Sequence, residues 1–120
     1  MLSVPGQVKI FLCLEPADMR RSFDGLAAMV EQVLAHDPLS GHLFVFRNRR
    51  GDRVKLLYWA GDGLCIWYKR LEVGTFRFPA ASGADDAPAR VSVSATDLAM
   101  LLDGVDLASV QRQQRYRRPA

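Results

Sequence analysis

The 120-residue chain has few of the residues on which several functional classes depend. Its two cysteines, Cys13 and Cys65, lie inside apolar segments, far in sequence from His36 and His42, so no zinc-site spacing occurs. We expect two buried thiols, with a redox pair as the alternative, and no metal or other cofactor. Both histidines are more typical of structural or solvated positions than of catalytic ones.

Long apolar runs are also missing from the chain. No stretch approaches the roughly 18 residues that a membrane helix needs. The first residues, MLSVPGQVKI, lack the basic flank and apolar stretch of a secretory signal. We therefore expect a cytoplasmic protein. The length fits one domain without internal repeats, and 49% hydrophobic residues suffice for a core.

Motifs for catalysis and for phosphate loops are absent as well. The two glycines of Gly61-Asp62-Gly63 are explained by a turn, and no serine lies in a known nucleophile elbow. A two-metal nuclease would need converging carboxylates, but each candidate has a simpler role. These roles are helix cap, turn residue or arginine partner, for Asp18, Asp24, Asp52, Asp62 and Glu72. We expect no catalytic residue and no enzymatic activity.

Cations are plentiful around a predicted hairpin. Alternating apolar residues at about 43–48 and 53–59 predict two strands, joined by the turn formers Asn48, Gly51 and Asp52. Five cations should gather at this hairpin tip, opposed by Asp52 alone. A rigid tip of this kind suits a polyanion better than a small substrate, and it indicates nucleic acid. The five are Arg47, Arg49, Arg50, Arg53 and Lys55.

The basic character extends beyond the hairpin. The net charge is +3 and the pI about 9.2, while acids concentrate in residues 85–106, so one side of the protein should be basic. We expect a domain at 1–107 and a basic tail at 108–120 that is disordered when alone. Further candidate nucleic-acid contacts are Lys69, Arg70, Arg112, Arg115, Arg117 and Arg118.

The remaining patterns predict an α+β fold, a single domain with a mainly antiparallel sheet and helices packed on it. Residues 63–72 are ambiguous. Helical spacing of Leu64, Tyr68 and Leu71 favours a helix there, although strand alternation also fits. The other expected elements are strands at 8–14, 75–78 and 91–94, a helix at 19–35 capped by Asp18, and a helix at 97–103 capped by Thr96.

Aromatic residues are numerous in the same region, and most are more typical of a core than of a stacking platform. Both faces of the predicted hairpin carry apolar residues. Either helices cover both faces, or one face is an interface. Trp59 and Trp67 are the candidates for stacking on bases or for binding a partner.

Four collinear strings carry a specific resemblance to a known family. They are DMRRSFDGLA (18–27), DPLSGHLFVFRNRRGDRVKLLYW (37–59), GDGLCIWYKRLEVGTFRFP (61–79) and LAMLLDGVDL (98–107). The chain resembles the small accessory protein of insertion sequence 66 family transposons, the second of the element's three reading frames. The main departure is the insert ASGADDAPAR at 81–90. The resemblance implies participation in DNA transposition, with catalysis assigned to a separate, longer reading frame.

Two hypotheses follow for the function. The first is a non-catalytic accessory factor that binds the DNA backbone at transposon ends through the basic hairpin and assists the transposase. The alternative is a protein adaptor that docks to the transposase without contacting DNA. In that case Trp59 and Trp67 would form the contact surface.

Overall fold

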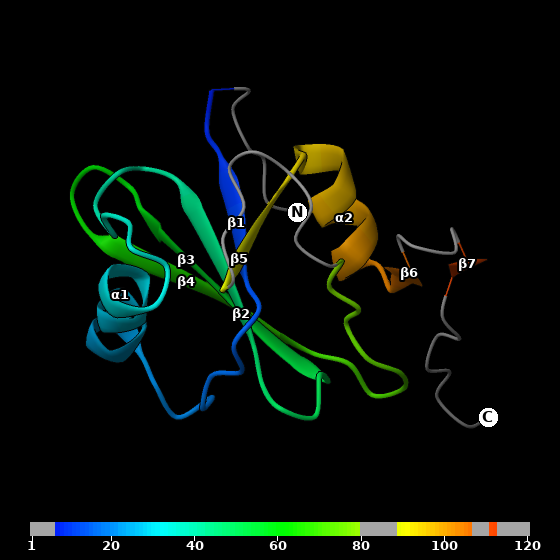
Figure 1. The fold of residues 1–120 in the computed structure, drawn as a ribbon. Helices are drawn as coiled ribbons and strands as arrows, with labels where there is room; N and C mark the ends of the chain where they lie inside the picture. Colours follow the sequence, from blue (N-terminus) through cyan, green and yellow to red (C-terminus); the bar gives the residue numbers. More distant parts are fainter. Residues whose placement is uncertain (1–6, 80–88, 107–110, 113–120) are drawn as a thin grey trace.

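The computed structural model describes residues 7–79, 89–106 and 111–112 (Figure 1). The elements follow in chain order: β1 (Ile10–Cys13), α1 (Phe23–Gln32), β2 (Leu43–Arg47), β3 (Arg53–Trp59), β4 (Leu64–Arg70), β5 (Arg90–Val93), α2 (Ala95–Leu102), β6 (Val105–Asp106) and β7 (Gln111–Arg112).

The central element is a five-stranded sheet with the order β4-β3-β2-β1-β5. β1 and β2 are parallel and are connected through α1, and every other neighbouring pair in this sheet is antiparallel. β6 and β7 form a separate two-stranded ladder. The expected α+β fold with a mainly antiparallel sheet is therefore confirmed.

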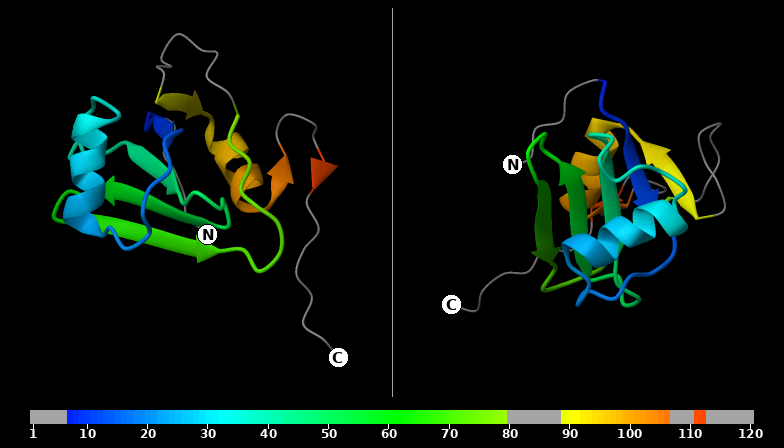
Figure 2. Two further views of the ribbon diagram at one scale, coloured as in Figure 1. Left: turned by 60° about the horizontal axis from the view of Figure 1, so that its bottom comes forward. Right: turned by 90° about the vertical axis from the view of Figure 1, so that its left-hand side faces the viewer.

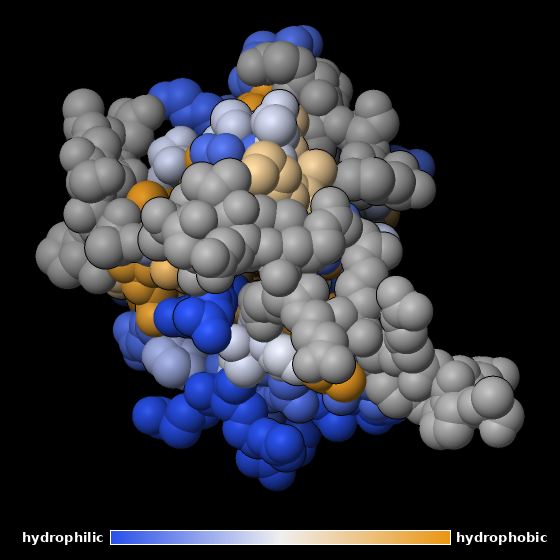
Figure 3. Space-filling view, turned by 90° about the vertical axis from the view of Figure 1, so that its right-hand side faces the viewer, coloured by the Kyte–Doolittle hydropathy of each residue, from blue (hydrophilic) through white to orange (hydrophobic). Residues whose placement is uncertain are grey.

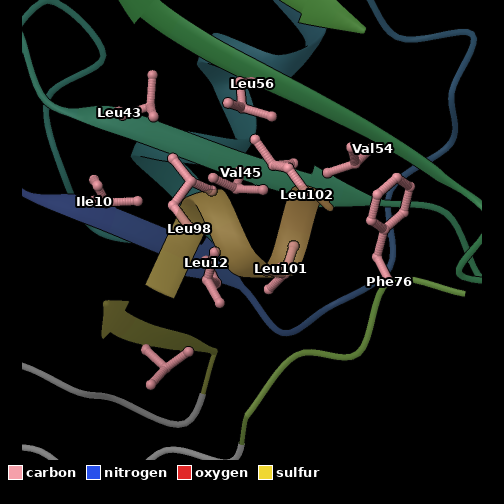
Figure 4. Packing of buried hydrophobic residues seen from close by; sticks show 11 residues of the cluster. Ile10, Leu12, Leu43, Val45, Val54, Leu56, Phe76, Leu98, Leu101 and Leu102 are labelled. Carbon is pink, nitrogen blue, oxygen red and sulfur yellow. The ribbon is translucent and has the colours of Figure 1, made fainter. Parts of the chain in front are cut away.

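Helices cover both faces of the sheet. In Figure 2 (right), α1 lies in front of the sheet and α2 behind it. Alternate residues of each strand therefore enter different cores. Phe11, Phe44 and Phe46 pack against α1. On the other face, Leu12 and Val45 pack against the leucines of α2 (Figure 4). Of the two arrangements left open by the sequence, the structure has helices on both faces.

The expected helix at 63–72 is wrong, because this segment forms β4. Gly61 has a φ of +95°, and the Ala60 N–H donates to the Gly63 carbonyl over 2.9 Å. This tight turn sends the chain straight back along β3, where all seven residues of β4 find a partner. A full ladder with β3 satisfies more backbone groups than an isolated helix of two or three turns would, so the helical spacing is overridden.

Both helices differ from their expected bounds, and the expected strands that form differ from theirs by at most two residues. α1 begins at Phe23 rather than at residue 19. Asp18 instead closes a turn, in which its Oδ1 accepts the Arg20 N–H over 2.8 Å. α2 begins at Ala95, and the Ser94 Oγ, not Thr96, accepts the Asp97 N–H over 3.0 Å.

Residues 75–78 do not form the expected strand. The Phe76 N–H donates to the Gly51 carbonyl over 2.7 Å, and the Phe76 ring is buried, so this segment is fixed against the hairpin turn. The short β6–β7 ladder was not expected from the sequence. The insert at 81–90 lies largely outside the described residues.

Candidate functional site

The β2–β3 turn is held by hydrogen bonds of Asn48. Its Oδ1 accepts the Arg53 N–H over 3.0 Å, and its Nδ2 donates to Asp52 Oδ1 over 2.7 Å. That second hydrogen bond lowers the pKa of Asp52 below its usual value. Gly51 occupies the left-handed region at a φ of +78° and closes the turn by donating to the Asn48 carbonyl. Arg49 and Arg50 are exposed at the apex.

A cleft of about 580 Å³ lies between this turn and the segment that follows β1. The Ala17 N–H donates to the Arg47 carbonyl over 2.9 Å and ties this segment to the end of β2. Hydrophilic residues gather at the same end of the molecule, at the bottom of Figure 3. The cleft is lined by Pro16, Ala17, Asp18, Met19, Arg20, Asn48, Arg49, Arg50, Asp52 and Arg53.

Charges of both signs line the cleft. Four arginines and two aspartates leave a net of two positive charges (4 − 2). Arg20 and Asp18 form an ion pair at 2.7 Å, and the hydrogen bonds from Arg20 lower the pKa of Asp18 to about 2. The Arg20 side chain is 91% exposed despite this pairing. The cleft can therefore bind an anion while keeping its own carboxylates ionised at neutral pH.

Lys55 does not belong to the exposed cations, although the sequence grouped it with the hairpin tip. Its side chain lies on the α1 face and the residue is only 8% exposed. The Nζ donates to the carbonyls of Met19 and Arg21 over 2.7 and 2.8 Å, and it lies 4.7 Å from the centre of the Tyr68 ring. Lys55 fixes one wall of the cleft.

Arg47 and Arg53 point to opposite faces of the sheet. Arg47 is half-buried on the α2 face, with its guanidinium 4.4 Å from the centre of the Phe78 ring. Burial lowers the pKa of Arg47. Arg53 lies on the α1 face, where it donates to the Tyr68 hydroxyl over 3.1 Å. Of the five expected cations, the structure brings Arg49, Arg50 and Arg53 together in the cleft. The side chains of the other two contact the protein itself and do not line the cleft.

The cations of β4 also have partners. Lys69 Nζ donates to the Leu102 carbonyl at the end of α2 over 2.8 Å. Arg70 forms an exposed ion pair with Glu72 at 2.8 Å, as the sequence led us to expect for this carboxylate. Arg112 falls in β7. Arg115, Arg117 and Arg118 lie outside the described residues.

Trp59 and Trp67 do not share a surface. Trp67 pairs with Leu56 and packs against the core on the α2 face. Trp59 pairs with Leu64 at the far end of the ladder, on the α1 face. Both indoles are half-buried. A partner surface built on the two tryptophans together is therefore not formed in one protomer.

The thiols and histidines do not line the cleft. Cys13 is buried as expected, which raises the pKa of its thiol, whereas Cys65 is half-buried, and both are free. His36 and His42 lie with ring centres 5.5 Å apart, beside Phe11 and Phe44. Within residues 7–79, 89–106 and 111–112, no three His, Cys, Asp or Glu side chains group as a metal site would require.

Comparison with known proteins identifies one family and two similar proteins. The family model for IS66 Orf2-like proteins matches residues 8–112. Two proteins of Sinorhizobium fredii (strain NBRC 101917 / NGR234), both named as uncharacterized, are similar along nearly their whole length. Protein y4hO is 36% identical over 96% of each chain, and protein y4jC is 37% identical over 94% of this chain and 92% of its own. No solved structure matches. Neither helix in the described residues is long and apolar enough to cross a bilayer.

Proposed function

The chain belongs to the IS66 Orf2-like family of transposition-associated accessory proteins, and we propose on that premise that it binds the DNA backbone through the arginine cleft and assists a separate transposase. In this proposal the chain carries out no chemical step. It supplies positive charge on a rigid turn, and the transposase supplies the catalysis.

The arginines at the apex of the β2–β3 turn carry this proposal. Within the described residues, no hydrogen bond or ion pair engages the side chains of Arg49 and Arg50. Arg20 stands across the cleft from them, almost fully exposed. Cations without a protein partner lose little on binding a phosphate, and each contact releases counterions from DNA. The rigid turn lowers the ordering cost of such contacts.

Salt dependence of DNA binding is the direct test. Fluorescence anisotropy with duplexes from the element's termini should give a slope of log affinity against log salt of about −3 to −4 for contacts from the cleft, before any contribution from the tail. Arg49→Ala/Arg50→Ala should make the slope shallower by about 2. Arg70→Ala is the matched control, because this exposed arginine is paired with Glu72 outside the cleft. A slope that the double variant leaves unchanged would refute the proposed site.

The basic tail is proposed as a second contact. Deleting residues 113–120 removes Arg115, Arg117 and Arg118 while keeping β7. The slope should become shallower by up to about 3, and the thermal midpoint should stay nearly unchanged. If the truncated protein binds DNA with the same affinity and the same salt slope as the full-length protein, the tail makes no contact and the cleft remains the candidate site.

Docking to the transposase without DNA contact is the second candidate. The observation that favours it is the pair of ionised aspartates inside the cleft, because a surface of mixed sign suits a protein partner as well as a phosphate. Co-purification with the transposase in nuclease-treated extracts separates the two. Two results together would replace the first proposal by this one. The wild type would show no affinity for DNA, and it would bind the transposase in a way that Arg49→Ala/Arg50→Ala abolishes.

A further inference from the structure

β4 forms one edge of the sheet. It is the terminal strand in the order β4-β3-β2-β1-β5, and its seven residues pair with β3 in an uninterrupted antiparallel register. The other edge, β5, has four residues. An edge strand leaves half of its backbone N–H and C=O groups without a ladder partner.

The register identifies the backbone groups that point outward. The Ala60 N–H bonds the Gly63 carbonyl at one end of the ladder, and the Leu71 N–H bonds the Asp52 carbonyl at the other. Hydrogen-bonded and non-hydrogen-bonded pairs alternate along an antiparallel ladder. Residues 63, 65, 67, 69 and 71 therefore direct their backbone groups to β3. The outward N–H and C=O groups belong to Leu64, Ile66, Tyr68 and Arg70.

This edge lacks several of the features that commonly prevent pairing, although its last two residues, Lys69 and Arg70, are cationic. The strand LCIWYKR contains no proline or glycine, and no bulge interrupts its register. Tyr68 is 46% exposed, and Leu64 and Ile66 are half-buried on the same face. In the described part of the chain, no strand or helix pairs with the outer side of β4.

We propose that β4 pairs antiparallel with β4 of a second copy of this chain, across a two-fold axis at Trp67. In this register Leu64 lies opposite Arg70 of the other copy, and Ile66 lies opposite Tyr68. All four outward-facing residues of each strand are then paired. The two five-stranded sheets become one continuous sheet of ten strands. The proposal does not rest on DNA binding.

Charge favours a second copy over an acidic peptide. The cations at the end of β4 are already satisfied, Lys69 by the Leu102 carbonyl and Arg70 by Glu72. Glu72 balances the charge of Arg70, so one net positive charge remains at this edge, that of Lys69, and its ammonium group is engaged at the end of α2. This single engaged charge gives little preference for an acidic strand. In the symmetric register no like charges lie opposite each other, because each cationic end meets the apolar end of the other strand.

The mass in solution, measured by light scattering behind a sizing column across a concentration series, tests the proposal. We expect a dimer that dissociates in the micromolar range, since the interface is a single strand pair. Tyr68→Pro removes an outward N–H without removing a bond to β3, and it should give a monomer. Tyr68→Ala is its matched control, because it loses the same ring but keeps the N–H, and it should still dimerise.

Cross-linking tests the register even if the proline variant folds poorly. In a Cys65→Ser background, Trp67→Cys places two thiols at the two-fold axis in a non-hydrogen-bonded pair, with Cα atoms about 4.5 Å apart. That separation suits a disulfide, so mild oxidation should give a covalent dimer. Leu64→Cys in the same background should give none, because the two copies of residue 64 would be about 20 Å apart.

Two results would overturn the proposal. The first is a wild-type protein that stays monomeric at every concentration, in which case the edge of β4 is either unpaired or bound by another protein. The second is a dimer that Tyr68→Pro leaves intact.

Discussion

The cations of the strands and the cations of the turn differ in what their side chains contact. Lys55 in β3 and Lys69 in β4 each donate to backbone carbonyls 33 to 36 residues away. Arg49 and Arg50, in the turn beyond the strands, are exposed and make no such bond within the described residues. A cation on a sheet face that a helix covers needs hydrogen-bond acceptors from the protein, because water cannot reach it freely. A cation in a turn beyond the helices stays hydrated and is available to a ligand.

The largest expected difference between the two groups is in stability, at Lys55. Lys55→Met keeps most of the aliphatic stem but leaves the carbonyls of Met19 and Arg21 without their donor. We expect the free energy of unfolding to fall by about 2–3 kcal/mol in urea denaturation. Arg49→Met is the control and should change it by less than about 0.5 kcal/mol. Equal effects at the two positions would remove the distinction between strand and turn cations.

A smaller effect is expected at Lys69. Its ammonium group binds the Leu102 carbonyl at the C-terminal end of α2, where positive charge also interacts favourably with the helix dipole. Because the residue is half-buried, Lys69→Met should cost about 1 kcal/mol in the same urea experiment. Arg70→Met, at the neighbouring exposed ion pair, should cost less than about 0.5 kcal/mol. A loss at Arg70 as large as that at Lys69 would contradict the assignment.

Local signals in the sequence predicted much of the fold. The turn formers from Asn48 to Asp52 placed the hairpin, and apolar periodicity placed α1, α2 and β5. β4 was missed because Leu64, Tyr68 and Leu71 satisfy the helical period, while Leu64, Ile66 and Tyr68 satisfy the strand period equally well. The distinction depends on pairing with β3, which is a tertiary interaction.

The candidate site was only partly predictable. The sequence identified the basic turn correctly as a turn, but it left open that Arg47 lies on one face of the sheet and Arg53 and Lys55 on the other, since this follows from the β2–β3 register. It could not reveal the second wall of the cleft, since Arg20 and Asp18 meet the turn only through the folded sheet. Nor could it show that Lys55 is engaged, because its acceptors lie some 35 residues earlier in the chain.

The smallest expected effect extends the comparison to a partly buried side chain that changes its charge near neutral pH. His42 Nδ1 accepts the Lys9 N–H over 3.0 Å, and burial, together with His36 and Lys9, lowers the pKa of His42 below its ordinary 6.5. The unfolded chain therefore takes up a proton first as the pH falls. The stability contributed by neutral His42 is full above about pH 6.5 and is lost as the pH falls from there through the lower folded pKa. Thermal midpoints between about pH 7.5 and 5 should decline less steeply in His42→Gln than in the wild type. Arg49→Gln, which changes an exposed turn cation, should keep the wild-type slope. If His42→Gln also keeps the wild-type slope, the partly buried imidazole contributes no more to the pH dependence of stability than an exposed side chain does.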